Sequence, residues 1–175
     1  PEKNEEDEPS FNNYKAEELP VFTDKGIWMR LIAGNAYGLP GTVKTKSPLF
    51  YLHVVLQAAA TFSLPVEHSE RGFYIVKGSV EIAGVKYQPG QMLVFVQSDN
   101  PKIVATEQTV LMMLGGEPLG ERHIWWNFVS SRKERIDQAK EDWKQGRILL
   151  PPHDNKEFVP LPEKKATTPS PEPLS

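Results

Sequence analysis

Short apolar runs separated by glycine and proline turns are the feature that most constrains how this chain can fold. Many short strands at close spacing, with only one convincing helix, are typical of a β-sandwich or a β-barrel. The sequence therefore predicts an all-β fold with one helix near its C-terminal end. The expected strands are Ile27–Ala33, Thr42–Thr45, Pro48–Leu56, Thr61–Leu64, Phe73–Val76, Ser79–Ile82, Val85–Tyr87, Gln91–Val96, Lys102–Ala105 and Thr109–Leu114.

The segment that follows Ser131 predicts one short amphipathic helix. Ser131 and Glu134 match a capping box, in which the serine oxygen accepts a hydrogen bond from a backbone N–H three residues on. Gly146 is the expected residue just past the helix end. We expect the apolar face to dock the helix by packing, with the tryptophan as its anchor. This face carries Ile136, Ala139 and Trp143.

An aromatic run, Ile124–Val129, predicts a strand with bulky side chains on both of its faces. One of the two adjacent indoles should then face the core and the other should face outward. Either the outward indole marks a contact patch, or the C-terminal helix covers it. The candidate interface residues are Arg122, His123, Trp125 and Trp126.

Composition excludes several classes of function. The net charge of −3 gives no electrostatic reason to expect direct nucleic-acid binding. The chain has no cysteine, which rules out disulfides, thiol catalysis and zinc–thiolate sites and agrees with a reducing cytoplasm. No apolar run approaches the roughly 20 residues that span a bilayer. Phosphate-loop and nucleophile-elbow motifs are also missing. We expect a cytoplasmic location, or a nuclear one in a eukaryote.

The two ends differ from the central part of the chain. Residues 1–10 form an acidic run without an apolar core and predict a disordered linker. Residues 162–175 are rich in proline, serine and threonine and predict a disordered tail. A single folded domain is therefore expected over residues 11–161. The chain begins at Pro1 and not at methionine, so we expect a fragment or a processed piece of a longer protein.

Two segments carry a family resemblance. The first, GFYIVKGSVEIAGVKYQPGQ from Gly72 to Gln91, has a hydrophobic strand, a glycine, a second strand, a small turn and then Pro-Gly. This order of strands and turns resembles that of cupin barrels. The second, GGEPLGE followed by WWNFVSSRKERIDQAKEDWKQGRI and EFVPLPE, resembles the C-terminal domain of the pirin family. The resemblance implies a cupin-type jelly-roll barrel, or double-stranded β-helix. It also implies a partner, an N-terminal cupin that carries iron, in a parent similar to quercetin 2,3-dioxygenases.

The metal pattern that the resemblance implies is altered in this chain. Cupins place two histidines as His-x-His on one strand face, then a carboxylate and a later histidine. Here the His-x-His position falls on Leu64-Pro65-Val66, and the later position falls near Asp99–Lys102. Because no histidine stands at any of these positions, we expect no metal and no other cofactor in this chain. Fe(II) would then belong to the N-terminal cupin of the parent.

Other residues remain as weaker site candidates. His68 lies between two glutamates, and His53 lies within an apolar strand, so each could be either a ligand or an ordinary structural histidine. The candidates for a metal are His53, Glu67, His68 and Glu70. A barrel cavity that either binds an apolar ligand or is filled by side chains would be lined by Leu64, Val66, Phe73 and Ile75.

Two functions follow from the resemblance. In the first, this chain is a metal-free C-terminal cupin that packs against an iron-binding N-terminal cupin and shapes its mouth. In the second, it is a protein-interaction module without catalysis, as the transcription-linked members of the pirin family suggest. The sequence leaves open whether the parent is an enzyme and, if so, which substrate it uses.

Overall fold

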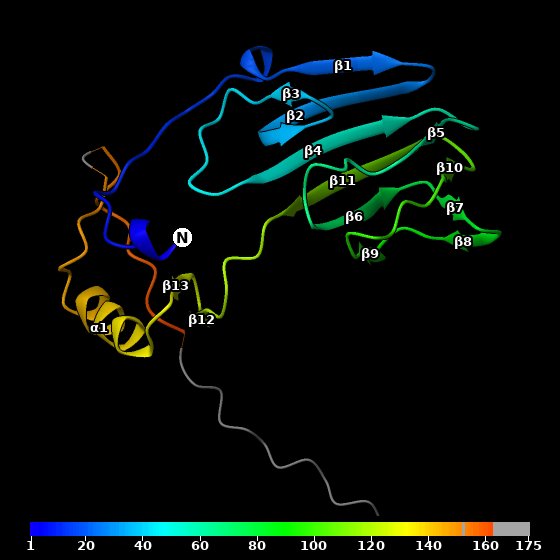
Figure 1. The fold of residues 1–175 in the computed structure, drawn as a ribbon. Helices are drawn as coiled ribbons and strands as arrows, with labels where there is room; N and C mark the ends of the chain where they lie inside the picture. The colour runs from blue at the N-terminus through cyan, green and yellow to red at the C-terminus, as the bar shows by residue number, and fades with distance from the viewer. Residues whose placement is uncertain (152, 163–175) are drawn as a thin grey trace, which may run out of the picture. The chain divides into compact units, whose positions relative to one another are not determined.

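The computed structural model of this chain describes residues 1–151 and 153–162. The described chain forms two compact units, one built mainly from Lys3–Leu119 and the other mainly from the residues that begin at Gly120. The strands of the first unit are drawn from blue to green in Figure 1, and the helix of the second unit is drawn in yellow and orange. The part of the tail predicted to be disordered that covers residues 163–175 lies outside the described residues.

Two antiparallel sheets build the first unit (Figure 1). The larger sheet has the strand order β1-β2-β4-β11-β6-β9, with β3 paired to β2. The smaller sheet has the order β5-β10-β7-β8. The bounds are β1 Val21–Asp24, β2 Ile27–Ala36, β3 Leu39–Pro40, β4 Leu49–Leu56, β5 Thr61–Phe62, β6 Glu70–Lys77, β7 Val80–Ile82, β8 Val85–Tyr87, β9 Met92–Phe95, β10 Ile103–Ala105 and β11 Thr109–Gly116.

The core is made of side chains that alternate along these strands. On β4, for example, Phe50, Leu52, Val54 and Leu56 are buried, while the residues between them are half-buried or exposed. The same period of two recurs on the other long strands, because successive side chains of a strand point to opposite faces of a sheet. These positions form one apolar cluster with residues of the smaller sheet such as Val80. The predicted all-β sandwich is therefore confirmed.

The second unit contains a hairpin and one α-helix. The hairpin joins β12 (His123–Trp125) to β13 (Phe128–Ser130), and α1 spans Lys133–Lys144. The prediction of one continuous strand over this region was wrong, because Trp126 has a positive φ of 54° and starts a tight turn.

Both ends of α1 can be compared with the predicted capping pattern. The N-cap is Arg132 and not Ser131, so the predicted capping box was wrong by one residue. At the other end Gly146 has a φ of 66°, and the N–H groups of Gly146 and Arg147 donate to the carbonyls of Trp143 and Asp142. These two hydrogen bonds form a Schellman motif, so the prediction that Gly146 follows the helix end is confirmed.

The predicted packing of the α1 face is also confirmed. Ile136 and Ala139 are buried. Trp143 packs against Trp126 and Phe158, with ring centroids 5.7 Å and 5.2 Å away, and its indole N–H donates to the carbonyl of Val159 at 2.9 Å. The helix is thereby held against the β12–β13 hairpin and against the segment after the helix that contains Phe158 and Val159.

Two regions outside the core differ from a simple strand pattern. The strand predicted at Thr42–Thr45 is not formed, because the Thr42 and Thr45 hydroxyls donate to the carbonyls of Glu18 and Ser47 and hold a loop. The acidic start of the chain contains 3-10 turns at Glu2–Asn4 and, further on, at Ala16–Glu18. In the acidic run Asp7 pairs with Lys46 at 2.7 Å. The disorder expected at residues 1–10 stays a prediction.

Candidate functional site

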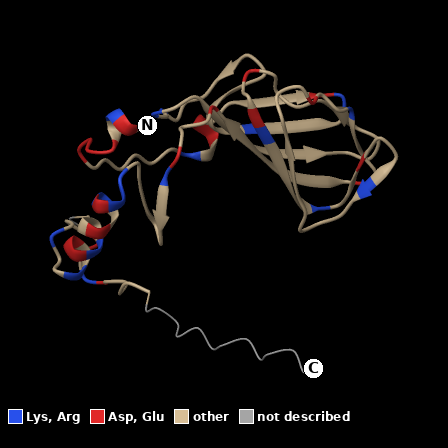
Figure 2. Cartoon of the chain, turned by 60° about the horizontal axis from the view of Figure 1, so that its bottom comes forward, with Lys and Arg blue, Asp and Glu red and all other residues tan. Residues whose placement is uncertain are grey.

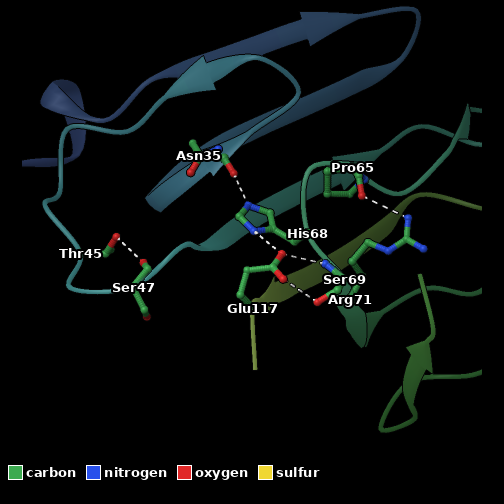
Figure 3. A network of polar contacts seen from close by, with 8 residues as sticks. All are labelled: Asn35, Thr45, Ser47, Pro65, His68, Ser69, Arg71 and Glu117. Carbon is green, nitrogen blue, oxygen red and sulfur yellow. Dashed lines mark hydrogen bonds and ion pairs between the residues drawn. The ribbon is translucent and has the colours of Figure 1, made fainter. Parts of the chain in front are cut away.

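A buried cation, Arg71, lies at one end of the sandwich. Arg71 belongs to the inward row of β6, which continues with Phe73 and Ile75, and it is only 3% exposed. Its Nη1 donates to the carbonyl of Pro65 at 3.2 Å (Figure 3). Its Nη2 lies within hydrogen-bond distance of the Val96, Gln97 and Asp99 carbonyls, at 2.8, 3.0 and 2.7 Å. Burying a charge is costly unless polar groups compensate it, and here four backbone dipoles do so.

A tight turn aims the three carbonyls of the β9–β10 loop at the guanidinium. The Asp99 N–H donates to the Val96 carbonyl at 3.0 Å, and the Val96 N–H donates to a carboxylate oxygen of Asp99 at 3.2 Å. These two bonds close the turn on itself. The guanidinium therefore connects the loop after β5, through Pro65, with the loop after β9.

A second polar group surrounds His68, which is 2% exposed (Figure 3). The ring contacts Phe50, with centroids 5.3 Å apart, and Nε2 lies 2.8 Å from the carbonyl oxygen of Asn35. Since a carbonyl only accepts, Nε2 carries the proton. Nδ1 faces Glu117, whose nearer carboxylate oxygen is 3.9 Å away. Glu117 in turn accepts hydrogen bonds from the backbone and the hydroxyl of Ser69, at 3.0 and 2.8 Å.

These two hydrogen bonds explain the acidity of Glu117. The Ser69 hydroxyl and then the Ser69 N–H stabilise the charged carboxylate and lower the pKa of Glu117 below its usual value of 4.5. This arrangement is a structural clamp between the start of β6 and the end of β11. Nε2 is engaged by Asn35, while Nδ1 is buried and has no hydrogen-bond partner among the described residues.

An apolar groove of about 550 Å³ opens beside the β5–β6 loop. The Tyr37 hydroxyl donates to the Ser63 carbonyl at 2.7 Å, and Glu67 accepts from the Gly38 N–H at 2.8 Å. Desolvation raises the pKa of the Tyr37 phenol, the Glu67 charge raises it further, and Arg71 opposes both effects. The apolar lining includes Phe22, Ile27, Met29, Phe62, Leu64 and Val66.

The four residues expected to line one cavity are separated by the structure. Leu64 and Val66 line the groove, although Leu64 is buried and Val66 is 70% exposed. Phe73 and Ile75 are fully buried in the core and contribute to packing. Leu64 and Val66 therefore border an open groove, while Phe73 and Ile75 belong to the apolar core. Whether this cupin binds an apolar ligand stays a prediction.

Comparison with known proteins places this architecture in a family. Residues 51–149 match the Pirin C-terminal cupin domain. The chain belongs to the pirin family. It is 48% identical to a pirin-like protein of Caulobacter vibrioides over 93% of this chain and 57% of that relative. It is 29% identical to human pirin over 80% of this chain and 51% of human pirin.

The solved structures support the cupin-type fold. A crystal structure of quercetin 2,3-dioxygenase from Acinetobacter baumannii superposes with a TM-score of 0.71 at 21% identity, covering 85% of this chain and 51% of that enzyme. The predicted pirin-like cupin with a C-terminal helix is thus confirmed. The chain spans about half the length of the curated relatives that it matches.

The residues of this pirin domain do not fit an iron site. Among the described residues, no group of three or more histidine, aspartate or glutamate side chains is placed to hold a metal ion. The segments that the family pattern assigns to histidine ligands contain Pro65 and Asp99, whose carbonyls bind Arg71. A second cation beside a buried guanidinium would be repelled, so we derive no chemistry through iron in this chain.

The metal candidates named from the sequence are distributed over different surroundings. His53 lies on the outer face of β4, where its ring packs edge-on against Trp28 at 5.4 Å. Glu67 lines the groove and accepts from the Gly38 N–H, His68 contacts Asn35, and Glu70 is exposed at the start of β6. Their nomination as ligands stays a prediction.

The candidate interface residues lie in and beside the β12–β13 hairpin. Arg122 precedes β12 and His123 begins it. The Lys140 ammonium lies over the Trp125 ring, 4.8 Å from its centroid, and the Trp126 ring packs edge-on against Trp143. Residues of α1 therefore contact both indoles, although Trp126 remains 38% exposed. A role of this hairpin in binding a partner stays a prediction.

A larger apolar surface covers the outer face of the seven-stranded sheet. An antiparallel sheet with one solvated face usually alternates apolar and polar residues, but here much of the outward row is apolar as well. Figure 2 shows these strands mainly without charge, whereas charged residues crowd α1. A shallow groove of about 440 Å³ lies at one end of this face, lined in part by Tyr51, Met92, Val94 and Leu114. The exposed apolar residues that β4, β6, β9 and β11 place on this face are Tyr51, Tyr74, Val76, Met92, Val94 and Leu114, which we call the sheet-face patch.

Arg71 and the sheet-face patch were both missed from the sequence. Arg71 shares the odd-numbered parity of Phe73 and Ile75, so extending the predicted strand by two residues would have placed it inside the barrel. The patch carries a similar signal, because Tyr74, Val76, Met92 and Val94 belong to the apolar runs Phe73–Val76 and Met92–Val96.

Within the described residues, no helix has the length and apolar character needed to cross a membrane. The longest candidate, α1, has 12 residues, and charged side chains occupy much of its surface.

Proposed function

We propose that this chain is the metal-free C-terminal cupin of a pirin-like protein and serves as the structural partner of an iron-binding N-terminal cupin. The parent would then be related in activity to quercetin 2,3-dioxygenases. The observation that carries this proposal is the sheet-face patch, a broad apolar surface on a sheet that is otherwise well packed. Burial of apolar area is worth about 25 cal/mol per Å², so covering such a face is a strong driving force for association.

The residues at the mouth of this cupin favour a structural role over a catalytic one. The guanidinium of Arg71 is bound to the segments that would carry metal ligands, and the imidazole of His68 is engaged by Asn35. Both side chains are buried, so neither is exposed to polarise oxygen or to move a proton from a flavonol. The iron chemistry of the parent therefore belongs to the other cupin, in the half of the relatives that this chain does not match.

Co-expression with the N-terminal half of the Caulobacter relative tests this proposal. We expect the two chains to copurify in a one-to-one complex that contains iron in proportion to the N-terminal half. Val94→Glu and Leu114→Glu place a charge in the sheet-face patch and should abolish copurification. Val85→Glu, at an exposed apolar residue of the smaller sheet, is the matched control and should leave it unchanged.

A flavonol oxygenation assay on the same complex distinguishes its two roles. Turnover that is proportional to the bound iron and is lost with Val94→Glu supports the role of this chain as the structural partner of an oxygenase domain. Complex formation with iron but without turnover favours the interaction module of a pirin-like co-regulator. Absence of any complex while both chains are folded would overturn the proposal.

A further inference from the structure

The geometry points to Arg71 as a chain-encoded replacement for the metal cation of a cupin, held in a guanidinium-binding site made of backbone carbonyls. This inference concerns the mouth of this chain alone and does not depend on the proposed partner. Four acceptors, the carbonyls of Pro65, Val96, Gln97 and Asp99, converge on two nitrogens of one side chain.

The position of the guanidinium is the first argument. The family resemblance assigns metal ligands to the segments Leu64–Val66 and Asp99–Lys102. Pro65 belongs to the first segment and Asp99 to the second, and the carbonyl oxygens of both accept hydrogen bonds from the same guanidinium. A metal ion in a barrel mouth connects two such segments through a central positive charge, and Arg71 makes the same connection from β6.

The chemistry of the acceptors is the second argument. Backbone carbonyls carry their partial negative charge on oxygen, and oxygen ligands of this kind hold cations in many proteins. The terminal nitrogens of arginine present hydrogens in a planar fork, so they reach carbonyls of two different loops at the same time. Lysine carries its donors on one nitrogen and lacks the two separate donor atoms that contact these loops.

The burial of the cation is the third argument. Arg71 is 3% exposed, and its Nε atom is buried without a hydrogen-bond partner among the described residues. A buried arginine with one N–H left without a hydrogen bond is not expected on grounds of stability alone. An apolar residue of similar size often gives the same stability or more. The four carbonyls compensate for this cost only through the terminal nitrogens, Nη1 and Nη2.

The inference makes a direct prediction about an emptied site. In Arg71→Ala the carbonyls lose their cation, and the loops after β5 and β9 lose their connection. We expect the melting temperature to fall by several degrees and to recover by at least half of that loss in millimolar methylguanidinium. The same concentration of sodium chloride should give little recovery, because sodium lacks the planar fork.

Two controls define specificity in this experiment. Wild-type protein should gain nothing from methylguanidinium, since its site is filled. Lys77→Ala removes a cation from the exposed end of the same strand and should show neither the loss nor the rescue. Equal stability of Arg71→Ala and wild type would overturn the inference, and so would a rescue by sodium chloride as large as that by methylguanidinium.

A measurement on the unaltered chain covers the case in which Arg71→Ala does not fold. Nitrogen-15 NMR of wild-type protein should show guanidinium hydrogens of Arg71 in slow exchange with water and close in space to Pro65 and Asp99. Averaged, rapidly exchanging guanidinium signals for Arg71 would contradict the carbonyl site. Free L-arginine in the same buffer supplies the reference for fast exchange.

Discussion

Nδ1 of His68 lies 3.9 Å from a carboxylate oxygen of Glu117, while Nε2 of the same ring donates to the carbonyl of Asn35 at 2.8 Å. This relationship fixes the start of β6 beside the end of β11. The ring is buried, so its loss should leave a cavity as well as an unpaired carbonyl. The site is therefore expected to matter for stability more than for catalysis.

Replacing His68 with alanine should lower the free energy of unfolding by about 2 to 3 kcal/mol, from the cavity and the lost hydrogen bond. Urea unfolding followed by tryptophan fluorescence measures this change. His153→Ala is the control, because His153 is exposed and its change should stay within about 0.5 kcal/mol. Equal effects of the two substitutions would show that the His68 contacts add no stability.

Glu117 should make the free energy of unfolding of the first unit depend on pH. Its pKa is lowered in the folded chain, so its contribution is fully present above the usual value of 4.5 and is lost as the pH falls through the lower folded value. Glu117→Gln should therefore destabilise the chain at pH 7 and differ little from wild type near pH 3. Urea unfolding at both pH values checks this, with Glu81→Gln as a surface control. A wild-type advantage that is as large at pH 3 as at pH 7 would contradict it.

Two glycines with positive φ allow the effect of backbone strain to be distinguished from the effect of steric crowding. Gly78 and Gly84 have φ values of 77° and 81°, so alanine at either position costs about 1 kcal/mol in backbone strain. A Cβ at Gly78 would also lie 2.4 Å from the Gln108 carbonyl, whereas a Cβ at Gly84 meets nothing within 4 Å. Gly78→Ala should thus lower the melting temperature clearly more than Gly84→Ala. Equal losses would mean that the backbone at Gly78 relaxes freely.

Trp143 should hold the segment that contains Phe158 against α1. Trp143→Ala removes the stacked ring and the hydrogen bond to the Val159 carbonyl, so we expect faster proteolysis near Phe158. Limited proteolysis with mass spectrometry locates the cut. Lys144→Ala changes the neighbouring exposed residue and should leave the cleavage rate near that of wild type. If both variants are cleaved at the same rate, Trp143 does not hold this segment.

Much of the fold could be predicted because its strands are short apolar runs separated by glycine and proline turns. β4 and β11 were predicted almost to their ends, since each is a continuous apolar run of this kind. β1 was missed because all four of its residues are exposed and pairing to β2 alone holds it at the sheet edge. The β12–β13 turn was missed because a tryptophan rarely adopts the positive φ found at Trp126.

The candidate site was harder to predict because backbone atoms build it. The resemblance to cupins showed where histidines were absent, but carbonyls of Pro65, Val96, Gln97 and Asp99 have no signature in the side chains. Only the inward parity of Arg71 on β6 points to them. The sheet-face patch was overlooked for another reason, since alternating apolar residues on both faces look like a doubly buried strand.

Native mass spectrometry after anaerobic incubation with excess Fe(II) and desalting tests the central claim most directly. A metal-free cupin whose mouth holds its own guanidinium predicts a single species at the 19.8 kDa mass of the bare chain. One iron retained per chain would contradict the account, because it would require ligands that coordinate metal despite Arg71.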